Sequence, residues 1–185
     1  MPVFQAGTSL AEILAGLYQL PVYYTSHQEG HIAAGLASTY TRLEADKFLA
    51  VHLSGGTTEI LSVSQRGAGY ATDIVGGTLD LHAGQLVDRI GVALDLGFPA
   101  GAELEWLAQH AGPEVPALAV NVVGGSFNLS GAEAQALALL AQGVLPSTLA
   151  RAVEDALVRA VAGALANLLQ TREERDILLV GGVAQ

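Results

Sequence analysis

The chain has 185 residues, of which 51% are hydrophobic and none is cysteine, and a formal net charge of −10 from 8 basic and 18 acidic residues. This length suits one domain or two small lobes, and the lack of cysteine excludes a disulfide framework. Because phosphate binding depends on Lys and Arg, the charge excludes nucleic-acid binding by the chain unaided. We find no apolar run long enough for a bilayer and no charged-then-apolar leader, so we expect a cytoplasmic protein without a membrane partner.

The N-terminal segment is predicted to contain two helices with a short strand between them. Apolar residues recur at helical spacing over residues 8–18, and Pro21 ends that segment before Val22–Tyr24, which is typical of a strand. Ser26 suits the N-cap of a second helix, which should run to about Tyr40.

The next part of the chain is predicted to be an antiparallel meander. Lys47–Leu53 and Thr58–Ser64 have strand patterns, and Ser54-Gly55-Gly56-Thr57 joins them through a glycine tip. Tyr70–Ile74 can extend the same sheet after a turn at Arg66-Gly67.

Helices dominate the remainder, which ends in one apolar strand. Asp176–Val180 has the pattern of a buried strand and continues into Gly181-Gly182. The predicted helices cover about 81–93, 101–110, 131–141 and 147–170, and the last should bury a face of Leu149, Val153, Leu157, Val161 and Leu165.

The predicted fold class is α/β, with two partial lobes. Residues 1–110 should form part of the first lobe, with the 47–64 hairpin, and residues 111–185 the helical part of the second, with the 176–180 strand. The boundary is expected in the Pro/Gly-rich region 111–125. A strand normally precedes such a first helix, and a helix normally follows a Gly-Gly strand end, so we expect a fold that is incomplete at both ends.

Residues 25–35 read TSHQEGHIAAG, with two histidines four positions apart. On a helix, His27 and His31 lie on one face and can present both imidazoles to one ion, but a catalytic zinc or iron site needs a third protein ligand. An equally good interpretation is that the rings form hydrogen bonds within the helix packing. Gln28 holds the place of the glutamate in a His-Glu-x-x-His peptidase, and Glu29 lies roughly 200° around the helix from His27, so metallopeptidase chemistry is disfavoured.

The glycine tip of the hairpin is a second candidate site. In Leu53-Ser54-Gly55-Gly56-Thr57 the missing side chains let backbone N–H groups approach phosphate oxygens, and the hydroxyls can add contacts. In isolation, however, the turn is better explained as an ordinary hairpin tip that needs no ligand.

Several motifs occur in a characteristic order along the chain. They are the His-x-x-x-His segment, SGGTTEI, GGTLDLHAGQLVDRIG, FPAG, SFNLSG and LVGGVA. In this order they resemble the TsaD/YgjD/Gcp family of tRNA threonylcarbamoyladenosine transferases, formerly called O-sialoglycoprotein endopeptidases, over nearly the whole chain. The resemblance implies the actin/Hsp70/sugar-kinase (ASKHA) fold, in which two RNase-H-like lobes hold a nucleotide between them.

The resemblance also implies a reaction and its cofactors. The family transfers a threonylcarbamoyl group from threonylcarbamoyl-adenylate to the exocyclic amine of the adenosine beside the tRNA anticodon. It implies a divalent metal, Fe or Zn, at His27 and His31, with the third ligand beyond Gln185. The adenine nucleotide or threonylcarbamoyl-adenylate is then expected to contact Leu53, Ser54, Gly55, Gly56, Thr57, the ribose-binding carboxylate Asp88, Gly101, Gly181 and Gly182.

Asp88 has a simpler explanation, and two positions depart from the family's motifs. Without the resemblance, Asp88 is better explained as a solvated acid or a partner of Arg89, although an acceptor-only carboxylate suits ribose hydroxyls. The family's histidine is replaced by Thr57 and an acidic residue by Gln85. No catalytic side chain is assigned, because the chain has no cysteine nucleophile and no serine in a nucleophile elbow. Because the family's first strands and its third metal ligand lie outside this sequence, we expect this chain to be inactive by itself.

Other functions stay open. The chain can be a non-catalytic paralogue that acts as an assembly or regulatory partner, and metal bound at His27 and His31 would argue against that role. A generic ASKHA phosphotransferase explains fewer motifs. Because a partial lobe leaves sheet edges uncovered, we expect a homodimer or a complex with a TsaB-like paralogue, with tRNA contacted only through a larger complex.

Overall fold

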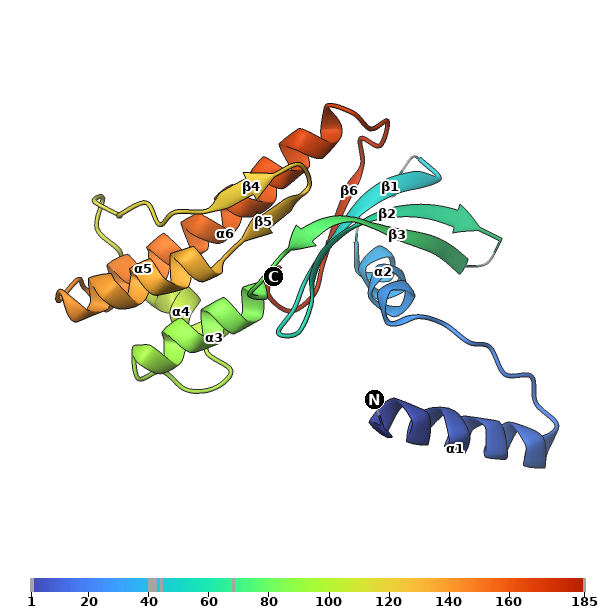
Figure 1. The fold of residues 1–185 in the computed structure, drawn as a ribbon. Coiled ribbons are helices and arrows are strands. Elements are labelled where there is room, and N and C mark those ends of the chain that lie inside the picture. Colours follow the sequence, from blue (N-terminus) through green and yellow to red (C-terminus); the bar gives the residue numbers. More distant parts are fainter. Residues whose placement is uncertain (1, 40–42, 44, 68, 185) are drawn as a thin grey trace.

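The protein is seen in a computed structural model that describes residues 2–39, 43, 45–67 and 69–184. A six-stranded mixed sheet with the strand order β4-β5-β3-β2-β1-β6 forms its centre (Figure 1). The strands are β1 (Lys47–Leu53), β2 (Thr58–Arg66), β3 (Gly69–Thr78), β4 (Asn121–Val123), β5 (Ser126–Asn128) and β6 (Ile177–Val180). The helices are α1 (Pro2–Tyr18), α2 (His27–Ser38), α3 (Ala83–Ala93), α4 (Gly101–Ala108), α5 (Ser130–Ala141) and α6 (Pro146–Leu169).

The meander predicted from the sequence is confirmed. β1 and β2 pair in antiparallel register from Lys47↔Ser64 to Leu53↔Thr58, and β3 extends the sheet on the other side of β2. The glycine tip is closed by a hydrogen bond from the Ser54 N–H to the Thr57 carbonyl at 2.8 Å.

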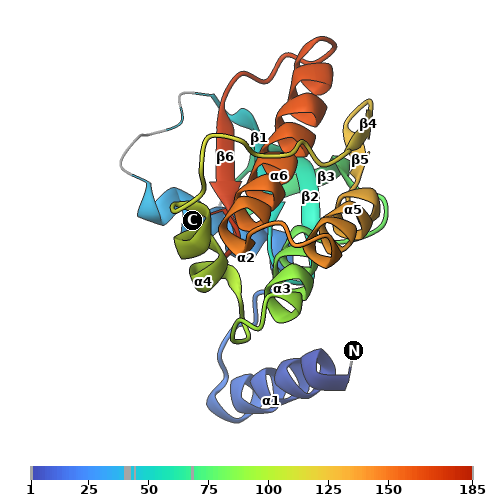
Figure 2. The ribbon, with the colours of Figure 1, turned by 90° about the vertical axis from the view of Figure 1, so that its left-hand side faces the viewer.

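Alternation along β1 and β2 divides the core into two layers. One face carries Val51 and Ile60 and packs against the helices α3 to α6, of which α6 lies across the sheet in Figure 2. The opposite face is covered by α2, whose Ile32 is fully buried. The side chains of β1 and β2 in this second layer are Phe48, Ala50, Leu61 and Val63.

Strand β6 lies in a different place from the one predicted. It pairs in parallel with β1, from Leu49↔Ile177 to His52↔Val180, so it shares a sheet with the 47–64 hairpin. The prediction that the two lie in different lobes is wrong, because this short apolar strand gains hydrogen bonds and burial at the edge of β1. The division of the chain near residue 110 stays a prediction.

Helix α6 turns the predicted face toward the core, but a second ridge is more deeply buried. Leu149 and Val153 are fully buried, and Leu157, Val161 and Leu165 are partly buried against the core. Small side chains let α6 approach its neighbours closely, and they form the fully buried ridge Ala152, Ala156, Ala160 and Ala164.

The N-terminal helix projects away from the sheet (Figure 1). The strand predicted at Val22–Tyr24 does not form, and Tyr23 and Tyr24 are exposed by 86% and 73%. An extended segment becomes a strand only when another strand satisfies its backbone, and this segment pairs with none in the described part of the chain. The predicted helix end at Tyr40 lies outside the described residues. No helix among those described is long and apolar enough to span a membrane.

Candidate metal and nucleotide site

A capping box fixes the first turn of α2. The Ser26 hydroxyl accepts a hydrogen bond from the Glu29 N–H at 3.1 Å, and the Ser26 N–H donates to the Glu29 carboxylate at 2.8 Å. The Tyr70 N–H of β3 donates to the same carboxylate at 3.3 Å. These backbone donors, Ser26 first and Tyr70 second, lower the pKa of Glu29. Helix α2 is thus anchored to the sheet, and Glu29 is engaged away from the histidines.

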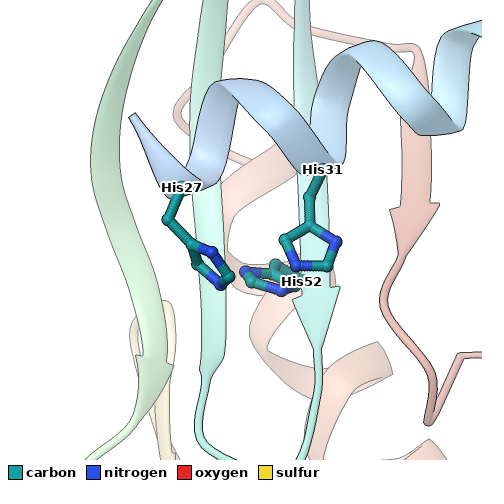
Figure 3. Close-up of side chains that lie close together, drawn as sticks. All are labelled: His27, His31 and His52. Atoms are coloured by element: carbon teal, nitrogen blue, oxygen red, sulfur yellow. The ribbon is translucent and has the colours of Figure 1, made fainter. Parts of the chain in front are cut away.

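His27 and His31 meet a third histidine that the sequence analysis did not identify. Figure 3 shows both rings directed from α2 toward His52 in β1. The ring centroids are 4.6 Å apart for His27 and His31, 4.2 Å for His31 and His52, and 5.5 Å for His27 and His52. One ring nitrogen from each residue lies within 4.8 Å of the other two. Small side-chain rotations would therefore bring three nitrogens to one ion.

His52 is fully buried, and its polar atoms are unsatisfied. Neither Nδ1 nor Nε2 has a hydrogen-bond partner among the described residues. Burial first, and then the neighbouring His31 and His27, lower the pKa of His52 to about 4. The ring is therefore neutral near pH 7, which is the form that binds metals. An imidazole set with an orphaned buried member fits a divalent ion such as Zn or Fe.

The ligand expected beyond Gln185 stays a prediction, and His52 adds a third candidate donor within this chain. The sequence held one signal for it, because His52 is the polar residue in the otherwise apolar stretch FLAVHL. Finding its partners required the packing of α2 across β1, which spacing along the chain does not specify.

The candidate phosphate turn lies beside the Gly-Gly segment that follows β6. The parallel pairing of β1 and β6 brings their ends together, and the Val183 N–H donates to the Leu53 carbonyl at 3.1 Å. Gly181 has a φ of 103°, and a Cβ there would overlap the Leu53 carbonyl. A Cβ at Gly55 or Gly56, by contrast, would meet nothing within 4 Å.

The start of α3 packs against the same turn. The Gly84 N–H donates to the Ser54 carbonyl at 3.2 Å, and the Ala83 N–H donates to the Thr58 hydroxyl at 2.8 Å. A Cβ on Gly84 would meet the Gly55 backbone, so glycine is required for this approach. The structure thus groups the 53–57 turn, residues 181–182 and the N-terminus of α3.

Asp88, farther along α3, lies beside the start of α4. Asp88 Oδ1 accepts a hydrogen bond from the Ala100 N–H at 2.9 Å, directly before α4 begins at Gly101. Arg89 does not neutralise Asp88, because its guanidinium pairs with Glu133 at 3.1 Å. Asp88 keeps acceptor capacity for a further partner.

A hollow of about 540 Å³ lies elsewhere, at the C-terminal end of α4. It is lined by residues of the 108–115 region together with Arg151 and Asp155, which pair at 2.9 Å. None of the candidate metal or nucleotide residues lines it.

Comparison with solved structures places the architecture in a known class. An activator of 2-hydroxyisocaproyl-CoA dehydratase from Clostridium difficile, solved with bound ADPNP, matches with a TM-score of 0.54 and 13% identity. The match covers 96% of this chain and 66% of that one. The chain therefore has the actin/Hsp70/sugar-kinase type of α/β fold that its motifs implied.

Sequence comparison assigns the family. Residues 4–185 match TsaD, described as tRNA N6-adenosine threonylcarbamoyltransferase. Relatives with that name include one from Thermus thermophilus, 32% identical over 96% of this chain and 54% of the relative, and one from Bacillus subtilis, 26% identical over 96% and 52%. The chain belongs to the TsaD family. It spans about half the length of the curated relatives it matches.

Proposed function

We propose that this chain carries the metal site and part of the adenylate site of a cytoplasmic tRNA N6-adenosine threonylcarbamoyltransferase. The observation that supports this most strongly is the convergence of His27 and His31 on the buried, unsatisfied ring of His52. A paralogue that served only in assembly would not need three imidazoles that converge on one point. We therefore favour the transferase over the non-catalytic paralogue.

Each part of the site has a distinct task in this proposal. His27, His31 and His52 would hold a Zn or Fe ion, which acts as a Lewis acid toward the carbamoyl or carboxylate oxygens of the substrate. The backbone N–H groups of the 54–57 turn bind the adenylate phosphate, which the open space at Gly55 and Gly56 admits. Asp88 accepts hydrogen bonds from the ribose hydroxyls.

The transfer proceeds by direct attack. The exocyclic amine of the tRNA adenosine forms a bond to the carbamoyl carbon, the bond from that carbon to the phosphate oxygen breaks, AMP leaves, and the amine proton passes to solvent. The chain needs no nucleophile of its own for this step, which agrees with the absence of cysteine from its sequence.

Partners are needed for tRNA in this proposal. With a formal net charge of −10, the chain offers little electrostatic attraction to phosphates. A second copy or a TsaB-like paralogue would cover exposed apolar side chains of α1 and contribute to the tRNA-binding surface. Those side chains are Leu10, Ile13, Leu14 and Leu17.

Binding of threonylcarbamoyl-adenylate tests the proposal. Calorimetry on the zinc-loaded chain should detect binding, and Asp88→Asn should weaken it by roughly 10-fold through loss of charged hydrogen bonds. Asn keeps an oxygen that can accept from the Ala100 N–H, so the fold is retained. Asp73→Asn, at an exposed position of β3, serves as the charge-matched control. No binding by the loaded chain, or equal affinity for Asp88→Asn, would contradict the proposal.

A further inference from the structure

Glu59 lies opposite His52 on the neighbouring strand β2. The antiparallel register pairs His52 of β1 directly with Glu59 of β2. Directly opposed residues project on the same face of a sheet, with Cβ atoms about 4.5–5.5 Å apart. The next pairs on this face, Ala50↔Leu61 and Phe48↔Val63, belong to the layer under α2. The apolar layer therefore ends in a histidine and a glutamate, directly where α2 presents His27 and His31.

The Glu59 carboxylate lacks a cationic partner. It is half-buried, and within the described part of the chain no Lys or Arg forms an ion pair with it. Its one polar contact among the described residues is with Gln28, whose Nε2 lies 3.5 Å from Glu59 Oε2. A partly desolvated carboxylate beside a buried unsatisfied imidazole is unfavourable unless a positive charge joins them. A divalent cation would supply that charge and satisfy both groups.

Gln28 is placed to orient the Glu59 carboxylate. It lies on α2 next to His27, and its amide reaches the carboxylate across the gap between α2 and β2. An amide N–H can hold one carboxylate oxygen while the other oxygen binds a metal, which is the usual arrangement of a partner outside the ligand shell. The glutamine at this position thus orients a carboxylate from another strand.

We propose that Glu59 is the fourth protein ligand of the ion held by His27, His31 and His52, with Gln28 fixing its second oxygen. This inference rests on the proposed function, because it takes the three histidines as the other ligands. Three imidazoles and one carboxylate would supply the four ligands that zinc usually takes, whereas an ion with six ligands, such as iron, would leave two positions for substrate oxygens. The identity of the ion then decides whether substrate must displace Glu59 in order to bind.

Competition with a chelating dye at pH 7.5 measures the contribution of Glu59 to zinc affinity. Glu59→Gln should weaken zinc binding by more than about 10-fold, since even partners outside the ligand shell contribute that much. Asp73→Asn removes the same charge from an exposed position of β3 and should leave the affinity unchanged. The melting temperature of each variant in excess EDTA, expected to be no lower than that of the wild type, checks that the fold is retained.

The outcomes separate this inference from the function on which it rests. If Glu59→Gln binds zinc as tightly as the wild type while His52→Ala does not, Glu59 is not a ligand and the three-histidine site stands. If the wild type itself binds no zinc, the proposed function fails together with this inference. An equal loss in Asp73→Asn would show that general charge, rather than ligation, sets the affinity, and would overturn the inference.

Discussion

Alanine in place of Gly181 is expected to lower the free energy of unfolding by about 3 kcal/mol, from a Cβ overlap and a strained backbone together. The backbone at Gly181 has a φ of 103°, a region that L side chains rarely adopt, and the added Cβ would overlap the Leu53 carbonyl at the end of β1. Urea unfolding followed by circular dichroism measures the loss.

Gly182 provides the matched control in the next position. A Cβ at Gly182 meets nothing within 4 Å, and its φ is not positive. Gly182→Ala should therefore change the free energy of unfolding by less than about 0.5 kcal/mol. Equal effects of the two substitutions would show that β6 does not end against β1 as described, and the grouping of residues 181–182 with the 53–57 turn would be lost.

Leucine in place of His52 is expected to stabilise the metal-free chain near pH 7 while removing its metal site. The wild type buries two imidazole nitrogens without partners, at a cost of about 1–3 kcal/mol, and leucine has no polar atom to satisfy. Urea unfolding in EDTA measures the gain. A histidine retained for packing alone, with its ring satisfied in solution, would instead make His52→Leu neutral or destabilising.

The free energy of unfolding should also depend on pH differently in the wild type and in His52→Leu. The pKa of His52 is lowered to about 4 in the folded chain, against about 6.5 when unfolded. Titration of His52 does not affect the free energy of unfolding above pH 6.5. As pH falls from 6.5 toward 4, the free energy of unfolding decreases, because only the unfolded ring takes up a proton. The wild type should thus lose up to about 3 kcal/mol over this interval beyond the loss seen in His52→Leu. Parallel pH profiles for the two proteins would contradict the burial of a neutral ring.

Sequence patterns predicted most helices, strands and turns, but not which strands pair with one another. Ser26 is the N-cap of α2, as its position before the helix predicts, and the Ser54–Thr57 turn joins two strands as its composition predicts. The apolar strand at 177–180 is equally clear in the sequence. Its pairing with β1 depends on contacts across more than a hundred residues, which periodicity does not report.

The candidate metal site likewise combines residues that the sequence predicts with residues that only the fold brings together. The spacing of His27 and His31 predicts one helical face, and a family resemblance predicts metal. His52 and Glu59 enter the site only through strand register and the direction from which α2 crosses the sheet. The alanine ridge of α6 was missed for a related reason, because a hydrophobicity pattern gives more weight to Leu and Val than to the small residues that permit close packing.

Zinc titration calorimetry at pH 7.5 tests the central claim, which is that His27, His31 and His52 form one metal site. The wild type should bind one zinc ion, and His27→Ala and His52→Ala should each bind it more than about 10-fold more weakly. His110→Ala, which removes an exposed histidine just beyond the end of α4, should bind as the wild type does. If His27→Ala and His52→Ala both retain wild-type affinity, or if the wild type binds no zinc, the three rings are packing residues and the metal-dependent transferase is contradicted.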